Sequence, residues 1–258
     1  MSAQAKTKAS QSWLFWSFIV LMAALIALFI YLGTWQMHRL GEKEALIAAV
    51  EERSHLPPEP LPPVADWPSI VPTDYDFRPI SLTGHFEVAQ TIEVFTSLSS
   101  PRGQYGGPGY WIVTPFVLDG GGTVMVNRGF VPEARARDFL NDPAAPQGDV
   151  TVSGLARQPE EVNAFTPAAE PAKRIDWARN PERLAALVDA SLLPVAPLYV
   201  DLPAGEAGAL PQGGETVMEF PNRHFEYAMT WYIFAAITPI MLAAWIWRQR
   251  RGPKAKED

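Results

Sequence analysis

Hydrophobic residues are concentrated in two uncharged segments, one near each end of the chain. Residues 13–32 form a run of 20 residues without a charge, and Tyr227 to Trp247 form a second run of 21. At 1.5 Å of rise per residue, each run covers roughly 30 Å as a helix, which is the thickness of a bilayer's hydrocarbon core. No A-x-A-like cleavage site follows the first run, so an anchor is predicted rather than a cleaved signal peptide. The pattern therefore predicts transmembrane helices at 13–32 and 225–247.

The helical period continues beyond the first apolar run. Residues 37–53 are strong helix formers, with Leu40, Ile47 and Val50 at helical spacing, which predicts a helical stalk over 33–55. A proline-rich stretch follows the stalk. Because proline fixes φ and lacks a backbone N–H, we expect 56–76 to be an extended linker or loop.

The central part of the chain has the twofold period that is typical of strands. Ile80, Leu82 and Phe86 alternate with polar residues, as in a strand with one buried face. The further expected strands are 91–98, 110–118, 123–130, 150–155 and 198–202.

Turn and cap signals complete this picture. Asp119 to Gly122 supply the glycines of a hairpin turn, the segment from Gly107 to Phe116 is expected as loop and strand, and Asn180 before Pro181 marks the start of a helix. The predicted fold class is an α+β membrane protein, in which an N-terminal and a C-terminal transmembrane helix flank a β-rich antiparallel extracytoplasmic domain, 77–222, with helical additions.

Both ends of the chain are basic and its middle is acidic. Residues 1–12 carry two lysines and no acid, and residues 248–258 carry five basic against two acidic groups, whereas 14 basic and 26 acidic residues lie between. By the positive-inside rule both tails are predicted to be cytoplasmic (or in the matrix) and the central domain to lie on the other side of the membrane. The net charge of −7 leaves no basic surface of the kind that nucleic acid needs.

Composition excludes much of metal and enzyme chemistry. The chain has no cysteine and only four histidines, so disulfides, thiolate metal sites and covalent haem attachment are excluded. No H-E-x-x-H, G-x-S-x-G, Walker or dinucleotide pattern occurs, and no catalytic residue is predicted. The glycine-rich stretch 101–109 precedes an expected strand, which favours an ordinary connection between strands over a phosphate site, with partner docking as the alternative.

His224 is the histidine that directly precedes the second apolar segment. On a helix it shares a face with Tyr227, Ala228 and Trp231, with Arg223 beside it. Histidine nitrogen is an iron ligand, apolar walls suit a porphyrin and arginine suits a propionate, so this face is a candidate haem site, although an interfacial histidine can equally be solvated. His38, about 9 Å beyond the first span on a continuing helix, is a reserve second ligand.

Several motifs resemble those of the surfeit locus protein family, the membrane-anchored assembly factors of haem–copper cytochrome c oxidase. They extend over nearly the whole chain. They are Leu32-Gly-Thr-Trp-Gln-Met-His-Arg39, Gly84-His-Phe86, Gly107 to Phe116, Val126-Asn-Arg-Gly-Phe-Val-Pro132, Arg157-Gln-Pro-Glu160, the region of Trp177, and Asn222 to Trp231.

The resemblance implies a non-enzymatic role in bringing haem a to oxidase subunit I, with His224 as the iron ligand. It also implies that the protein is located in the bacterial inner membrane with a periplasmic domain. The expected partners are subunit I, the lipid bilayer and haem a synthase. Two alternatives stay open: a structural docking protein that stabilises a subunit I intermediate without binding haem, and an enzyme that acts on haem. The enzyme is disfavoured because only one histidine abuts a span.

Overall fold

The computed structural model describes residues 3–142, 145–218 and 220–251, with side chains from Trp13 onward. The side chains of the expected tail 1–12, and residues 252–258 of the expected tail 248–258, lie outside this description. The described chain forms two compact units, one made of the segments up to residue 48 and from 219, the other of residues 49–218.

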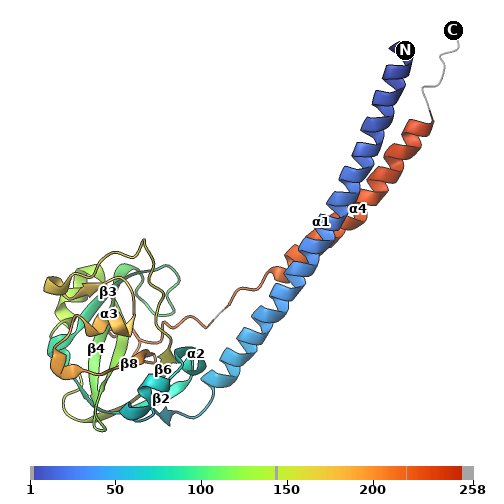
Figure 1. The fold of residues 1–258 in the computed structure, drawn as a ribbon. Coiled ribbons are helices and arrows are strands. Elements are labelled where there is room, and N and C mark those ends of the chain that lie inside the picture. Colours follow the sequence, from blue (N-terminus) through green and yellow to red (C-terminus); the bar gives the residue numbers. More distant parts are fainter. Residues whose placement is uncertain (1–2, 143–144, 219, 252–258) are drawn as a thin grey trace. The chain divides into compact units, whose positions relative to one another are not determined.

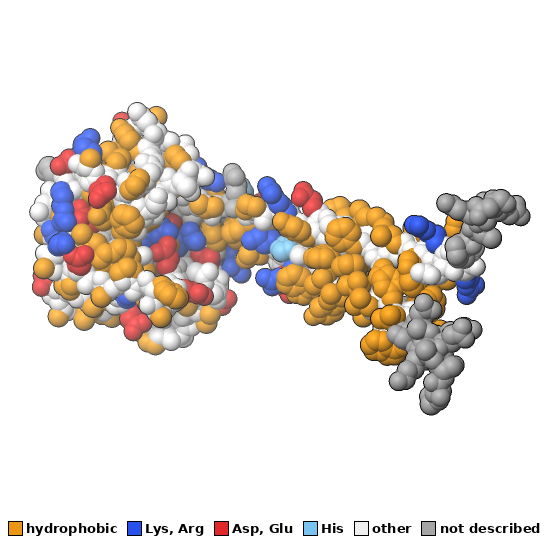
Figure 2. All heavy atoms as spheres, turned by 90° about the horizontal axis from the view of Figure 1, so that it is seen from above, with side chains coloured by type: hydrophobic (Ala, Val, Ile, Leu, Met, Phe, Trp, Pro, Cys, Tyr) orange, Lys and Arg blue, Asp and Glu red, His pale blue; other side chains and the backbone are white. Residues whose placement is uncertain are grey.

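The first unit is a pair of long helices, α1 (Ala3–Ser54), which continues into the second unit, and α4 (His224–Arg250) (Figure 1). Both are long and apolar enough to cross a membrane, by length and composition. Hydrophobic side chains cover much of the surface of this pair (Figure 2), and large ones such as Trp16, Val20 and Ile240 are exposed. An apolar surface of this extent requires a partner or a lipid environment.

Helix α1 runs without interruption to Ser54, through the residues for which a helical stalk is predicted. The expectation of an extended linker at 56–76 is wrong in part. A 3₁₀ helix, η1 (Val64–Ser69), and a short helix, α2 (Pro72–Tyr75), form there, with Trp67 buried in the core. Proline is well tolerated at the first turn of a helix, and Pro72 occupies that position in α2.

The second unit is β-rich, and the expected strands are found. Two further strands of two residues each, β1 and β7, are too short to give a periodic pattern. The strands are β1 (Glu59–Pro60), β2 (Pro79–Phe86), β3 (Ile92–Leu98), β4 (Gly107–Leu118), β5 (Thr123–Pro132), β6 (Val150–Arg157), β7 (Ile175–Asp176) and β8 (Val195–Asp201). The short helices between them are η2 (Val88–Gln90), η3 (Glu133–Phe139), η4 (Pro171–Lys173), α3 (Pro181–Ala185) and η5 (Ala190–Leu192).

Five of these strands close into a barrel. The sheet order is β1-β2-β6-β8-β5-β4-β3-β7, and β2 pairs with β4 as well as with β6, which completes the ring β2-β6-β8-β5-β4. The expectation of an antiparallel sheet is wrong for β5–β8, β1–β2 and β3–β7, which pair in parallel. The alternation of apolar residues gives the buried face of a strand but not its direction, and the long connection from β5 to β8 permits a parallel crossover.

Alternate residues of all five ring strands form the barrel interior. Ile80, Leu82 and Phe86 of β2 point inward as the sequence pattern predicts. The other strands add their own inward residues, Phe116, Val124, Val126, Ala156, Ala196, Leu198 and Val200. A second core lies on the outer face of β4, β5 and β8, where α3 contributes Leu184. Asn180 caps α3 as predicted, because its side chain accepts hydrogen bonds from the backbone N–H groups of Glu182 and Arg183.

Gly84 allows two strands to approach closely where β2 changes neighbour. Gly84 has φ +155° and pairs with both β6 and β4, and a Cβ there would lie 1.9 Å from the carbonyl oxygen of Val117. It marks the point at which β2 changes neighbour and the ring closes. The segment from Gly107 to Phe116 is strand throughout rather than loop and strand. The Asp119–Gly122 turn does join β4 and β5, with positive φ at Gly121 and Gly122.

Candidate functional site

Aromatic contacts fix α1 and α4 side by side in opposite directions. Phe15 stacks on Trp245 with ring centroids 5.3 Å apart, and Phe29 stacks on Trp231 at 5.8 Å. Thr34 Oγ1 lies 3.3 Å from the hydroxyl of Tyr232. The two helices are therefore antiparallel, so that later residues of α1 contact earlier residues of α4.

His224, the first residue of α4, faces α1. Its Nδ1 lies 2.7 Å from Oε1 of Gln36, and its side chain is half-buried. The backbone N–H of His224 donates to Oδ1 of Asn222 at 3.3 Å. The helix start and the imidazole are thus each held by a side-chain amide.

The other predicted haem-site residues divide into two groups. Trp231 is half-buried against Phe29 and shares the α1-facing side of α4 with His224 and the buried Ala228. Tyr227 is 55% exposed and the Arg223 side chain is also exposed, so neither is buried against α1. His38 is exposed, and it follows Gln36 by two residues, which places it about 200° around the helix from the contact with His224.

Three polar residues of α1 near His224 were missed by reasoning from sequence. Gln36, Arg39 and Lys43 are spaced three and four residues apart, so they share one face of the helix. Arg39, Lys43 and His224 line a cavity of about 250 Å³ together with Glu42 and Leu46. Arg39 Nη1 is 2.7 Å from Glu42, and Lys43 Nζ lies 4.9 Å from the ring centre of Phe220. The signal was present as polar residues at helical spacing just past the first apolar run.

The barrel unit has a buried polar network centred on Asp201. The carboxylate is 4% exposed and accepts hydrogen bonds from Asn127 at 2.8 Å and from the Thr216 hydroxyl at 2.7 Å. Arg157 and Arg179 lie 3.5 Å and 3.4 Å from its two oxygens. Two segments noted as motifs, 126–132 and 157–160, therefore converge on one buried acid.

Arg179 joins this network to the aromatic core. It binds Glu160 through Nε and Nη2 at 2.9 Å and 2.6 Å, and its guanidinium lies over the rings of Trp111 and Tyr199. Burial lowers the pKa of Arg179, but the acidic groups around it outweigh this and raise the pKa above its ordinary value. Burial also raises the pKa of the Tyr199 phenol, so this residue is neutral and the arginine charged at physiological pH.

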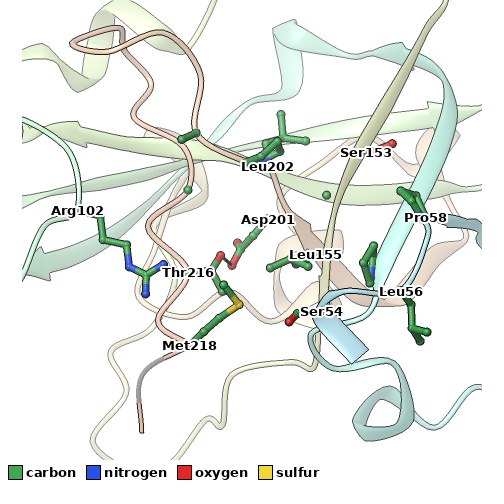
Figure 3. A pocket seen from close by; sticks show the side chains of 15 residues that line it. Ser54, Leu56, Pro58, Arg102, Ser153, Leu155, Asp201, Leu202, Thr216 and Met218 are labelled. Carbon is green, nitrogen blue, oxygen red and sulfur yellow. Dashed lines mark hydrogen bonds between the residues drawn. The ribbon is translucent and has the colours of Figure 1, made fainter. Parts of the chain in front are cut away.

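A cavity of about 510 Å³ opens beside this network. Figure 3 shows Asp201 and Thr216 in its centre, with Arg102 on one side and Leu56 and Pro58 on the other. Such a volume is typical of small-molecule pockets. The oxygens of Asp201 are already engaged by the network, so the carboxylate anchors the wall of the cavity.

The glycine-rich connection between β3 and β4 is held in place by the segment that follows β8. The backbone N–H groups of Arg102 and Gly103 donate to Glu215 at 2.8 Å and 2.7 Å, and Gln212 exchanges hydrogen bonds with the backbone of Tyr105. These hydrogen bonds support the interpretation of the glycine-rich stretch 101–109 as an ordinary connection between strands. In the described part of the chain, no group of three or more His, Asp or Glu side chains is placed to hold a metal ion.

These observations define a class of protein: two apolar helices, with a histidine held at the start of the second, that carry a closed β-barrel domain. The profile of the SURF1 family matches residues 23–236. The chain therefore belongs to the SURF1 family.

Relatives align over most of their own length. The SURF1-like protein of Monosiga brevicollis is 33% identical over 240 residues, which cover 86% of this chain and 83% of that protein. Surfeit locus protein 1 of Homo sapiens is 30% identical over 238 residues, 86% of this chain and 74% of the human protein. The cytochrome oxidase assembly protein SHY1 of Saccharomyces cerevisiae is 26% identical over 307 aligned positions, 92% of this chain and 77% of the yeast protein.

Proposed function

We propose that this chain is a membrane-anchored assembly factor of haem–copper cytochrome c oxidase that binds haem a and assists its insertion into subunit I. Membership in the SURF1 family and the name of the yeast relative support the oxidase assembly role. Subunit I is the expected partner that receives haem, and haem a synthase the expected partner that supplies it. In this proposal the protein binds and transfers its cargo and catalyses no reaction.

The observation that carries the haem proposal is the place of His224, half-buried between α1 and α4 beside an open cavity. Haem a, when bound, supplies an iron atom that accepts an axial imidazole nitrogen. The residues present suit such a group, because Nδ1 is taken by Gln36 and Nε2 is the nitrogen left for the metal. Trp231 and Tyr227 would flank the porphyrin.

Cations near His224 suit the two acidic propionate groups of haem. Arg223 is the partner that the sequence suggests, and Arg39 and Lys43 line the cavity that His224 also lines. Guanidinium binds carboxylate in a planar fork and ammonium binds it as a point charge. Because these groups are near water, each contributes less to binding than the iron bond does.

The proposed location is the bacterial inner membrane, with both termini cytoplasmic and the barrel domain periplasmic. The exposed apolar surfaces of α1 and α4 support insertion, and the basic tails support the orientation. A reporter that is active only in the cytoplasm, fused after Pro146, is expected to be silent, and the same reporter fused after Asp258 is expected to be active. Activity of the Pro146 fusion would contradict this topology.

Replacing His224 tests the haem proposal. In His224→Ala, purified at equal yield from cells that synthesise haem a, we expect the haem absorption to be lost while the protein stays in the membrane, since its apolar length is unchanged. The oxidase assembled with this variant should contain less haem a. His55→Ala, at an exposed position in the turn after α1, serves as the control and should keep its haem. Unchanged haem occupancy in His224→Ala would favour the docking role, in which subunit I is stabilised without haem binding.

A further inference from the structure

The hydrogen bond between Gln36 and His224 joins residues 188 positions apart, one on each helix of the first unit. Both side chains are half-buried. The contact of Thr34 with Tyr232, and that of Gly33 with the ring of Tyr232, lie within one turn of Gln36 on α1. These contacts fix the register of the two helices, and so the Gln36 amide is held opposite the imidazole.

The chemistry of this contact determines which imidazole nitrogen carries the proton. An amide oxygen only accepts hydrogen bonds, so Nδ1 of a neutral His224 must donate to Oε1 of Gln36. The lone pair of the ring then lies on Nε2, the nitrogen that is left for a metal. Histidines that bind metals commonly donate their other N–H to a carbonyl or carboxylate, which fixes the tautomer and the ring orientation.

We propose that Gln36 is a positioning residue that holds His224 in the Nδ1–H tautomer, with Nε2 presented to the iron. The inference deepens the proposed haem site and rests on it for its function. The tautomer of the His224 imidazole, however, is a property of the ligand-free protein, so it can be measured independently of haem.

Nitrogen-15 NMR of the full chain in detergent micelles tests the tautomer directly. With labelled histidine only four imidazoles give signals, and His224→Ala identifies those of His224. In the ligand-free wild type at pH 8 we expect a protonated Nδ1 and an unprotonated Nε2. Gln36→Leu should convert this to a mixture of tautomers, because leucine is similar in size but accepts no hydrogen bond.

Two further variants separate positioning from general damage to the structure. Gln36→Glu keeps an acceptor at the same place and should retain the Nδ1–H tautomer. Met37→Leu, at an exposed neighbouring position, should change neither the tautomer nor ligand binding. An Nε2–H tautomer in the wild type, or an unchanged spectrum in Gln36→Leu, would overturn the inference.

Titration with hemin, followed by its absorption, tests the functional half. Loss of a partner that orients a metal ligand typically weakens metal binding 10–100-fold, so Gln36→Leu should lower hemin affinity by about that factor and Gln36→Glu should restore most of it. A changed tautomer with unchanged hemin affinity would refute the positioning role. If His224→Ala binds hemin as tightly as the wild type, the proposed function is refuted instead. The NMR result is independent of hemin, so it shows whether the tautomer inference or the proposed function has failed.

Discussion

Gly33 of α1 lies directly against the ring of Tyr232 on α4. A Cβ atom at position 33 would be 2.7 Å from Cε1 of Tyr232, closer than carbon atoms pack. Small residues that let helix backbones approach are typical of helix pairs in membranes, where van der Waals packing replaces the hydrophobic effect. Gly33 therefore lets the two helices approach closely within one turn of Gln36.

Gly33→Val should push the helices apart near His224. We expect a longer distance between spin labels on cysteines introduced at Leu28 and Phe234, both of which are exposed, measured by pulsed EPR. The chain has no native cysteine to interfere. Gly41→Val is the control, since a Cβ there meets no described atom within 4 Å, and it should leave the distance unchanged. Equal distances in the two variants would refute the close approach.

Arg179→Met should destabilise the barrel strongly. It leaves Asp201 and Glu160 without a cation that binds both, and breaking a buried ion pair on one side costs about 3–5 kcal/mol. For a domain of this size that corresponds to a fall in melting temperature of roughly 6–20 °C, measured by circular dichroism. Arg135→Met removes an exposed pair with Asp138 and should cost at most about 1 kcal/mol. Similar losses in both would argue against the buried network.

Glu93 should make the stability of the barrel domain depend on pH. Its carboxylate is buried in β3 and neither oxygen accepts a hydrogen bond from the described residues, although Arg137 lies 3.4 Å away. Burial raises the pKa of Glu93 above its ordinary 4.5, with Arg137 and Arg174 acting in the opposite direction. The folded state holds this proton more tightly than the unfolded chain, so its stabilising contribution is complete below pH 4.5 and is lost as pH rises through the raised pKa.

The variant Glu93→Gln removes that dependence. Relative to wild type, its melting temperature should rise at pH 8, while the difference should be smaller at pH 4, where the wild-type carboxyl is protonated in both states. Exposed Glu133→Gln should show no such trend. A larger gain at pH 4 than at pH 8 would contradict the sign of the raised pKa.

Gly109→Ala should destabilise the ring at the pairing of β4 with β5. A Cβ there would lie 2.4 Å from the carbonyl oxygen of Val131 and 2.6 Å from the ring of Phe130. Backbone and a buried ring cannot both give way, and overpacking costs about 1–3 kcal/mol. Gly120→Ala in the β4–β5 turn, with no described atom within 4 Å of the new Cβ, is the matched control. Equal melting temperatures in the two variants would show that a Cβ atom at position 109 is accommodated without strain.

Local pattern predicted the parts of this fold, and long-range contacts decided how they combine. The alternation in Ile80, Leu82 and Phe86 identified β2 and its buried face, and Asn180 identified the start of α3. Nothing in the sequence of β2 shows that it pairs with two neighbours and closes a ring. The parallel pairing of β5 and β8 was missed because periodicity carries no strand direction.

The same contrast between local pattern and long-range contacts applies to the candidate site. His224 was identified because its own surroundings, an apolar run and an aromatic face, are local in sequence. Gln36 lies 188 residues away, and its role depends on the register of two helices, which single-helix patterns do not specify. Asp201 was expected only as a strand residue, since its partners Asn127, Arg157 and Arg179 come from separate segments.

The position of β8 in the ring has a consequence for biosynthesis. This strand lies between β6 and β5 and supplies the pairing that joins them, yet it is the last strand to leave the ribosome. At translation rates of about 5–20 residues per second, β2 to β6 must wait on the order of ten seconds with open edges, which are prone to aggregate. Any nascent chain released before Val195 therefore has no closed barrel to fold into, and quality-control proteases in its compartment should recognise it as unfinished.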